Sequence, residues 1–88
     1  MILGQVTLGA AATQISTHGI GYRQLVIQNN ATHDVRYGDS TVTATRGILL
    51  NPGGSSNEGA ISIQGGVLST EYLFGTSGDV IDFAYLPA

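Results

Sequence analysis

Hydrophobic and polar residues alternate along short stretches of this chain, and no long stretch shows the apolar spacing of an amphipathic helix. The clearest stretch is Tyr22–Gln28, where Leu25 and Ile27 share one face and polar side chains occupy much of the other. A second alternating stretch, Val80–Leu86, lies near the end of the chain. Alternation with a period of two predicts strands that are half-buried in antiparallel sheets.

Segments of strand length recur about every ten residues and are bounded by Gly, Asn, Asp and Pro. The predicted strands are Ile2–Leu8, Ala11–Ser16, Tyr22–Gln28, Asp34–Gly38, Ile48–Leu50, Ala60–Ile63, Thr70–Phe74 and Val80–Leu86. The spacing predicts an all-β fold, a small antiparallel β-sandwich or barrel of about seven or eight short strands with no significant helix. Residues 1–88 are expected to form a single domain.

Two features of this pattern leave alternatives open. Residues 1–8 are either the first strand of the domain or an arm that pairs with the sheet edge of a neighbouring molecule. In Thr70–Phe74, either Tyr72 and Phe74 or Leu73 faces the core. The connection Gly75–Gly78 is predicted to close a hairpin, and Asn51–Gly54 is predicted to turn the chain.

The composition favours a protein that assembles with others. The chain is 42% hydrophobic, only 10% of its residues are charged, and it has no cysteine. A small domain with so little surface charge and no disulfide is expected to gain stability by association. The net charge of −3 disfavours nucleic-acid binding, and no apolar run is long enough for a membrane span.

The sequence Gly38-Asp39-Ser40 resembles a hydrolase nucleophile motif, with His18 and His33 as candidate bases. Such a serine also needs an oriented base and oxyanion donors, on a scaffold with helices. The competing interpretation is a turn, in which Gly38 supplies an unusual φ angle while Asp39 and Ser40 bond to the local backbone. We favour the turn.

No other group of residues predicts chemistry. The side chains of His18, His33, Asp34 and Asp39 match no metal-ligand spacing. We therefore predict no enzymatic activity, no metal site and no cofactor, and interpret the chain as built to pack and to bind.

Four motifs in a fixed order resemble a group of small all-β structural proteins of tailed bacteriophages. The motifs are Gln28-Asn29-Asn30, Val35-Arg36-Tyr37-Gly38-Asp39-Ser40 followed by Val42, Gly47-Ile48-x-Leu50-x-Pro52-Gly53, and Tyr72-Leu73-Phe74-Gly75-Thr76-Ser77-Gly78-Asp79. The resemblance extends from about Val6 to Leu86.

This resemblance implies a virion component of the head-decoration, or cement, type. Such a protein would bind the major capsid protein on the outer head surface and stabilise the shell, with self-association as a trimer favoured. It would be found on the capsid surface of the virion, and in the host cytoplasm during assembly. A tail, baseplate or fibre-adaptor module is the first alternative. A carbohydrate-binding β-module is the second, and it would need an exposed aromatic residue such as Tyr37.

The residues expected to contact a partner come from three sources. The arm interpretation contributes Ile2 and Leu3. The three cations are candidates because arginine often anchors interfaces by pairing with carboxylates. The full set is Ile2, Leu3, Arg23, Arg36, Tyr37 and Arg46.

Overall fold

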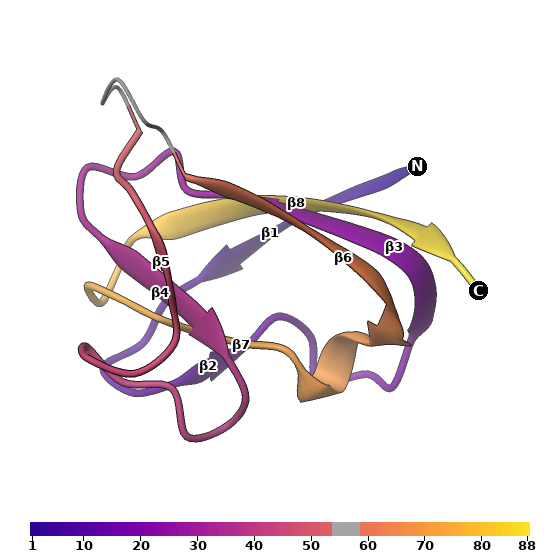
Figure 1. The fold of residues 1–88 in the computed structure, drawn as a ribbon, viewed down its shortest axis with the longest axis horizontal. Coiled ribbons are helices and arrows are strands. Elements are labelled where there is room, and N and C mark those ends of the chain that lie inside the picture. Colours follow the sequence, from indigo (N-terminus) through magenta and orange to yellow (C-terminus); the bar gives the residue numbers. More distant parts are fainter. Residues whose placement is uncertain (54–58) are drawn as a thin grey trace.

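The computed structural model describes residues 1–53 and 59–88 and consists of two four-stranded antiparallel sheets (Figure 1). Sheet A has the order β1 (Ile2–Thr7), β8 (Val80–Pro87), β3 (Gly21–Gln28) and β6 (Ala60–Val67). Sheet B has the order β2 (Thr13–Gln14), β7 (Tyr72–Phe74), β4 (Val35–Gly38) and β5 (Ile48–Leu50). The all-β prediction is confirmed, and the sheets form a sandwich that does not close into a barrel.

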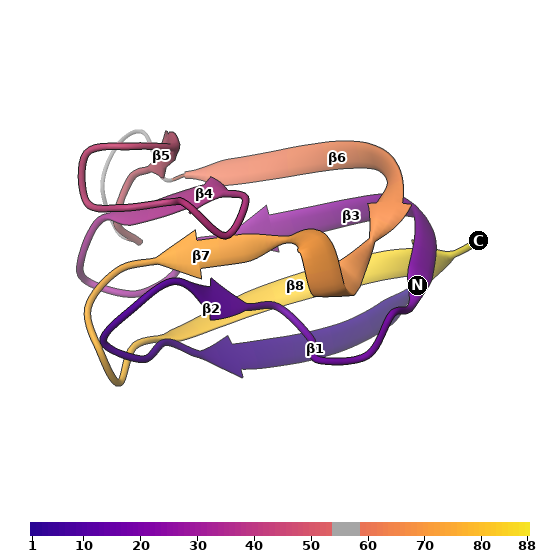
Figure 2. The same ribbon diagram turned by 90° about the horizontal axis from the view of Figure 1, so that it is seen from below.

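Consecutive strands lie in opposite sheets at every step except β4 to β5. The predicted hairpin at Gly75–Gly78 is therefore wrong, because β7 belongs to sheet B and β8 to sheet A. Its turn chemistry is still present: Gly78 has a φ of +93° and its N–H donates to the carbonyl of Leu8 at 2.9 Å. The alternation of strands thus spreads short chain segments over both layers, as seen from below in Figure 2.

The core fills the space between the sheets with aliphatic side chains. Its fully buried members come from both layers and include Leu25, Ile27, Val35, Leu50, Leu73 and Ile81. The inward faces predicted for Tyr22–Gln28 and Val80–Leu86 are confirmed, because Leu25, Ile27 and Ile81 have no exposed surface. Leu73 resolves the alternative in the late strand, since it is buried while its two neighbours are only half-buried.

The observed strands differ from the predicted ones mainly at their ends. Strand β6 continues to Val67 and is followed by a short 3-10 turn, η1 (Leu68–Thr70), where Ile63 had been expected to end the strand. Strand β2 is only two residues long. The predicted turn at Asn51–Gly54 lies partly outside the described residues, because Gly54 is not among them.

Candidate binding surfaces

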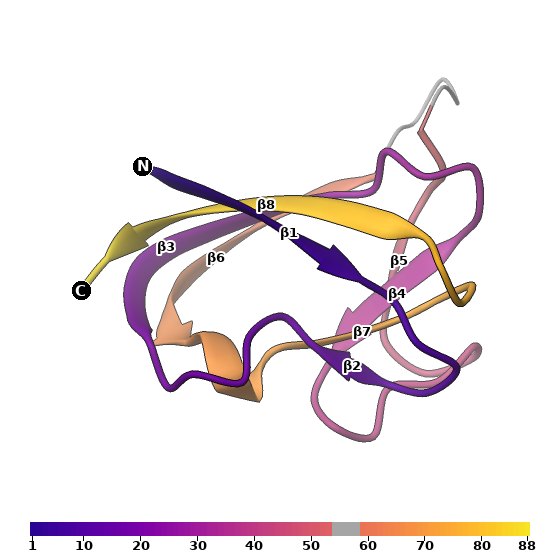
Figure 3. The same ribbon diagram turned by 180° about the vertical axis from the view of Figure 1, so that it is seen from behind.

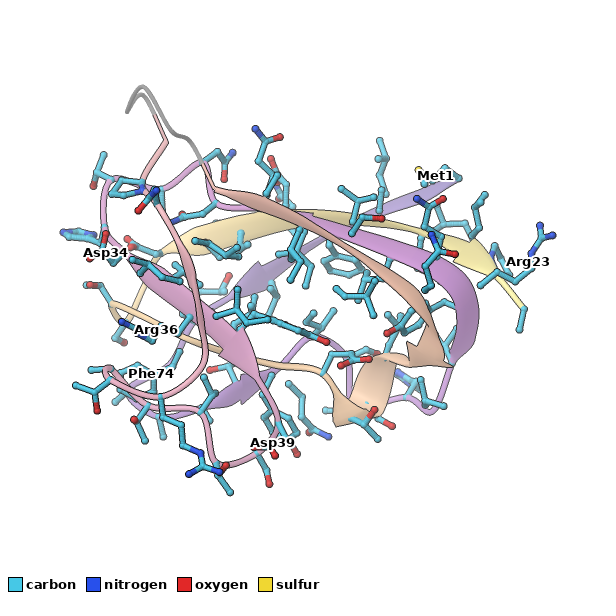
Figure 4. The ribbon with its side chains drawn as sticks, in the orientation of Figure 1. Met1, Arg23, Asp34, Arg36, Asp39 and Phe74 are labelled. Carbon is cyan, nitrogen blue, oxygen red and sulfur yellow. The ribbon has the colours of Figure 1, made fainter. Side chains whose placement is uncertain are left out.

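The residues expected at an interface fall at two ends of the molecule. Figure 4 shows Met1 and Arg23 at one end, and Arg36 with Asp34 and Phe74 at the other. Figure 3 places both chain ends at the first of these, beside β1 and β3. Of the six predicted residues, Ile2, Leu3 and Arg23 lie at the first end and Arg36 at the second. Tyr37 is half-buried against the core, and Arg46 is exposed in the loop between β4 and β5.

The first surface is the outer edge of β1, here called the β1 edge (Ile2–Thr7). All six residues of β1 pair in register with β8, and β1 forms the end of sheet A. Leu3 is 82% exposed and Ile2 is 45% exposed. Residues 1–8 are thus packed as the first strand of the sandwich, which favours that alternative over a detached arm.

The amide of Gln5 anchors the β1 edge to the strand behind it. Gln5 Nε2 donates to Asp82 Oδ1 at 2.8 Å, and Asn30 Nδ2 donates to Asp82 Oδ2 at 2.8 Å. A shallow depression of about 570 Å³ runs along this edge, lined by Leu3, Gly4, Gln5, Asp82 and Phe83. Arg23 lies near this end, exposed, with its Nε donating to the Pro87 carbonyl at 3.2 Å.

The second surface lies on the outer face of sheet B. Arg36 pairs in register with Leu49 on one side and with Phe74 on the other. These three residues, here called the sheet B patch, point away from the core because each has a buried neighbour in its strand, namely Val35, Leu50 or Leu73. They border a depression of about 270 Å³, whose other lining residues are Asp34, Ala44, Gly75 and Thr76.

Arg36 also organises the loop that joins β4 to β5. Its Nε donates to the Ala44 carbonyl at 3.0 Å and its Nη1 donates to the Gly47 carbonyl at 2.8 Å. A guanidinium carries five N–H donors in a planar fork. Two are used in these bonds, so Arg36 holds the loop and still presents donors at the patch.

Tyr37, by contrast, faces the interior. Its ring packs against the core and its hydroxyl donates to Glu71 Oε1 at 2.7 Å. The hydroxyl of buried Tyr22, from the other sheet, donates to Glu71 Oε2. Burial raises the pKa of both tyrosines, and the hydrogen bond to the Glu71 carboxylate raises it further. Tyr37 is therefore not an exposed aromatic platform, which removes the residue on which the carbohydrate-binding alternative depended.

The turn at Gly38-Asp39-Ser40 is observed, although the predicted role of Gly38 is wrong. Asp39 Oδ1 accepts the Thr41 backbone N–H at 2.8 Å and also the Thr41 hydroxyl. These bonds hold the pKa of Asp39 below its usual value, with a smaller contribution from nearby Arg46. The unusual φ belongs to Gly47, at +130°, because Gly38 still lies in the extended strand β4.

Of the two histidines, His33 contacts one carboxylate. His33 Nδ1 lies 2.8 Å from Asp79 Oδ2, and its ring is about half exposed. Within residues 1–53 and 59–88, no three His, Cys, Asp or Glu side chains gather closely enough to hold a metal ion. The same part of the chain contains no helix long and apolar enough to cross a membrane.

Two important polar residues escaped the sequence analysis. Asn29 is fully buried, and Glu71 joins Tyr22 of sheet A to Tyr37 of sheet B. A signal existed for Asn29, since it directly follows an alternating strand and begins a turn. For Glu71 no local signal exists, because its two partners lie 49 and 34 residues away in the sequence.

Comparison of the chain with protein-family models, with curated proteins and with solved structures finds no match.

Proposed function

We propose that this protein is a structural component of a tailed-phage virion, a head-decoration protein that binds the outer head surface and stabilises it. The docking surface in this proposal is the sheet B patch. The observation that supports it is that three of the four virion-like motifs meet in sheet B. They supply β4, β5 and β7, which are adjacent strands of that sheet.

The chemistry of the sheet B patch suits protein recognition. Arginine and aromatic residues are enriched at the energetic centres of interfaces. Here a half-buried Arg36 lies between the half-buried ring of Phe74 and Leu49, which is 43% exposed. Arg36 is already oriented by the Ala44 and Gly47 carbonyls, so little side-chain freedom would be lost when a partner carboxylate binds.

Repetition over a lattice strengthens the proposal. A single contact of this size would be weak, but many identical contacts on a shell act together. Binding to the assembled lattice also stabilises a small fold by mass action. The partner in this proposal is the major capsid protein, and the free chain would be found in the host cytoplasm before it is added to the head.

Quantitative mass spectrometry of purified virions from the phage that encodes the chain tests the proposal. We expect a copy number of the same order as the major capsid protein. A handful of copies located at the tail would replace this proposal with the tail or baseplate alternative. Complete absence from virions would reject both.

A binding experiment then tests the surface. Heads lacking this protein are mixed with the purified chain and sedimented. The variant Leu49→Lys should bind much less, because it places a hydrated charge in the patch. The matched control Ser62→Lys lies on the outer face of sheet A and should bind normally. Equal binding by both variants would rule out the sheet B patch as the docking surface.

A further inference from the structure

The β1 edge is the one long, uninterrupted open edge among the described strands. Sheet A ends in β1 and β6, and sheet B ends in β2 and β5. Strands β2 and β5 have only two and three residues. Strand β6 is interrupted by Gly65, whose φ of +73° departs from an extended conformation. Strand β1 keeps six residues in continuous register with β8.

The backbone groups that β1 presents outward can be identified from its pairing. The Leu8 N–H donates to the Asp79 carbonyl at 2.8 Å, so the backbone at Leu8 faces the β8 side. In an antiparallel pair, successive residues alternate between facing the partner strand and facing away. Leu3, Gln5 and Thr7 therefore direct their N–H and C=O groups toward the open edge, where none of the described strands pairs with them.

This edge also lacks the features that normally prevent edge pairing. Proteins protect open edges with lysine, proline, bulges or inward charges. Residues 2–7 contain no charge and no proline, and their register with β8 shows no shift. An edge of this kind is ready to accept another antiparallel strand.

We propose that two copies of this chain pair through the β1 edge, antiparallel and about a two-fold axis at Gln5, so that two A sheets join into one eight-stranded sheet. A strand paired with its own copy places Leu3 of one copy opposite Thr7 of the other, and Gln5 opposite Gln5. Each Gln5 amide that keeps one N–H on Asp82 still has a second N–H and a carbonyl oxygen for the amide opposite, so the two amides can donate to each other.

The charges near the axis are compatible with this arrangement. Asp82 is opposite Gln5 in the β1–β8 register, so the row across the interface would read Asp82, Gln5, Gln5 and Asp82. With strands about 4.8 Å apart, the two carboxylates would be about 14 Å apart, which exceeds the Debye length in physiological salt. Each carboxylate also accepts hydrogen bonds from Gln5 and Asn30 of its own chain.

Side chains on both faces of β1 would be covered by this pairing. On the inner face, Ile2 would lie beside Leu8 of the second copy, which reduces its present 45% exposure. On the outer face, Leu3 gains a neighbour in Thr7. A two-fold contact is isologous and closes at two copies, whereas the trimer implied by the sequence resemblance needs a different, heterologous contact.

The first experiment measures the mass of the purified chain by light scattering over a dilution series. We expect a dimer of twice 9.1 kDa that dissociates on dilution. The variant Gln5→Lys places two ammonium groups opposite each other and should raise the dissociation constant about tenfold or more. Its fold should survive, because the new ammonium lies beside Asp82. The matched control Gln64→Lys, on exposed β6, should leave the dissociation constant unchanged. A monomer at all concentrations, or a trimer, would overturn the proposal.

A second experiment tests the register directly. The chain has no cysteine, so one introduced cysteine can form a disulfide only between copies. Residues opposite each other in an antiparallel pair have Cα atoms about 5.5 Å apart, within the range that a disulfide spans. Gln5→Cys should oxidise readily to a covalent dimer, and Gln64→Cys should not. Equal crosslinking of both variants would reject the two-fold at Gln5. Both experiments use the chain alone, so their outcome is independent of head binding.

Discussion

The two sheets of this sandwich are stabilised in different ways. Sheet A has strands of six to eight residues, and its strands β1 and β8 pair in continuous register over six residues. Sheet B has strands of two to four residues, and its loops are tied by side chains: Arg36 binds two loop carbonyls, and Asp39 binds the N–H of Thr41. In sheet B, polar side chains substitute for backbone pairing.

This difference also separates the two proposed surfaces. A long regular strand presents a repeating row of backbone groups, which suits pairing with an identical strand. Short strands with ordered loops present individual side chains, which suits recognition of a different protein. We therefore expect self-association from sheet A and partner docking from sheet B.

The variant Asn29→Ala is the strongest test of whether sheet B depends on side-chain hydrogen bonds for its stability. Asn29 is fully buried; its Nδ2 donates to the carbonyls of His33 and Leu50 at 2.8 and 2.9 Å, and its Oδ1 accepts the Ala31 N–H at 3.1 Å. Removing it leaves these backbone groups unpaired where water has little access. We expect a loss of about 3 kcal/mol in the free energy of unfolding, measured by urea denaturation.

Its neighbour provides the control. Asn30 is exposed and its Nδ2 donates only to Asp82 Oδ2 among the described bonds. Asn30→Ala should cost less than about 1 kcal/mol, because water can replace the lost bond. If the two variants lost equal stability, the buried amide would not be the tie between the β3–β4 turn and β5.

The next largest effect is expected from Gly47→Ala in the β4–β5 loop. Gly47 has a φ of +130°, and a Cβ there would lie 2.7 Å from Val42 Cγ2 and 2.8 Å from the Tyr37 carbonyl oxygen. Backbone strain and the clash together should cost about 2–3 kcal/mol.

Gly65→Ala separates these two causes. Gly65 also has a positive φ, of +73°, but a Cβ there meets nothing within 4 Å. Only the strain remains, so we expect a loss of about 1 kcal/mol by the same denaturation measurement. A larger loss at Gly65 than at Gly47 would contradict the role of close packing in the sheet B loop.

The sequence was sufficient to predict what depends on local pattern. The alternation of apolar residues located β3 and β8 nearly to the residue, and a short apolar run located β5. Leu25, Ile27 and Ile81 face the core as expected. Clusters of Gly, Asn and Asp located the loops, because these residues favour turn conformations through local interactions alone. It did not predict which sheet each strand would join, so a connection between sheets at Gly75–Gly78 was mistaken for a hairpin.

The features that were missed depend on contacts between distant segments. Tyr37 was a candidate for an exposed aromatic residue, but its hydroxyl donates to Glu71, which lies 34 residues further along the chain. The sequence identified the three arginines as candidate contact residues, but it did not show which groups their guanidinium groups bind. Nothing near Arg36 in the sequence shows that its guanidinium binds carbonyls 8 and 11 residues further along.

Burial of Tyr22 and Tyr37, together with their hydrogen bonds to Glu71, should make the stability of the protein depend on pH. Tyrosine in an unfolded chain ionises near pH 10, and the pKa values of Tyr22 and Tyr37 are raised in the folded protein. The stabilisation is therefore complete below pH 10 and is lost as the pH rises toward the folded pKa. For buried Tyr22 the loss should be about 1 kcal/mol per pH unit above 10, measured from urea denaturation at each pH.

Substitution by phenylalanine checks the origin of this loss. Tyr22→Phe removes the ionisable group while it keeps the ring, so the decline in stability above pH 10 should become shallower. At neutral pH the same variant should be less stable than the original chain, because Glu71 loses one of its two hydroxyl donors. An unchanged alkaline slope would assign the decline to other groups.

The smallest change in the free energy of unfolding is expected at two arginines, Arg36 in β4 and Arg46 in the loop that joins β4 to β5. Arg36→Met keeps the apolar stem but removes the bonds to the Ala44 and Gly47 carbonyls, so it should cost about 1 kcal/mol by urea denaturation. Arg46 is exposed and interacts with Asp39 only through solvent-screened charge, so Arg46→Met should change stability by less than about 0.5 kcal/mol. Equal effects would mean that the loop is held by its backbone turns alone, and sheet B would then resemble sheet A more closely than its short strands indicate.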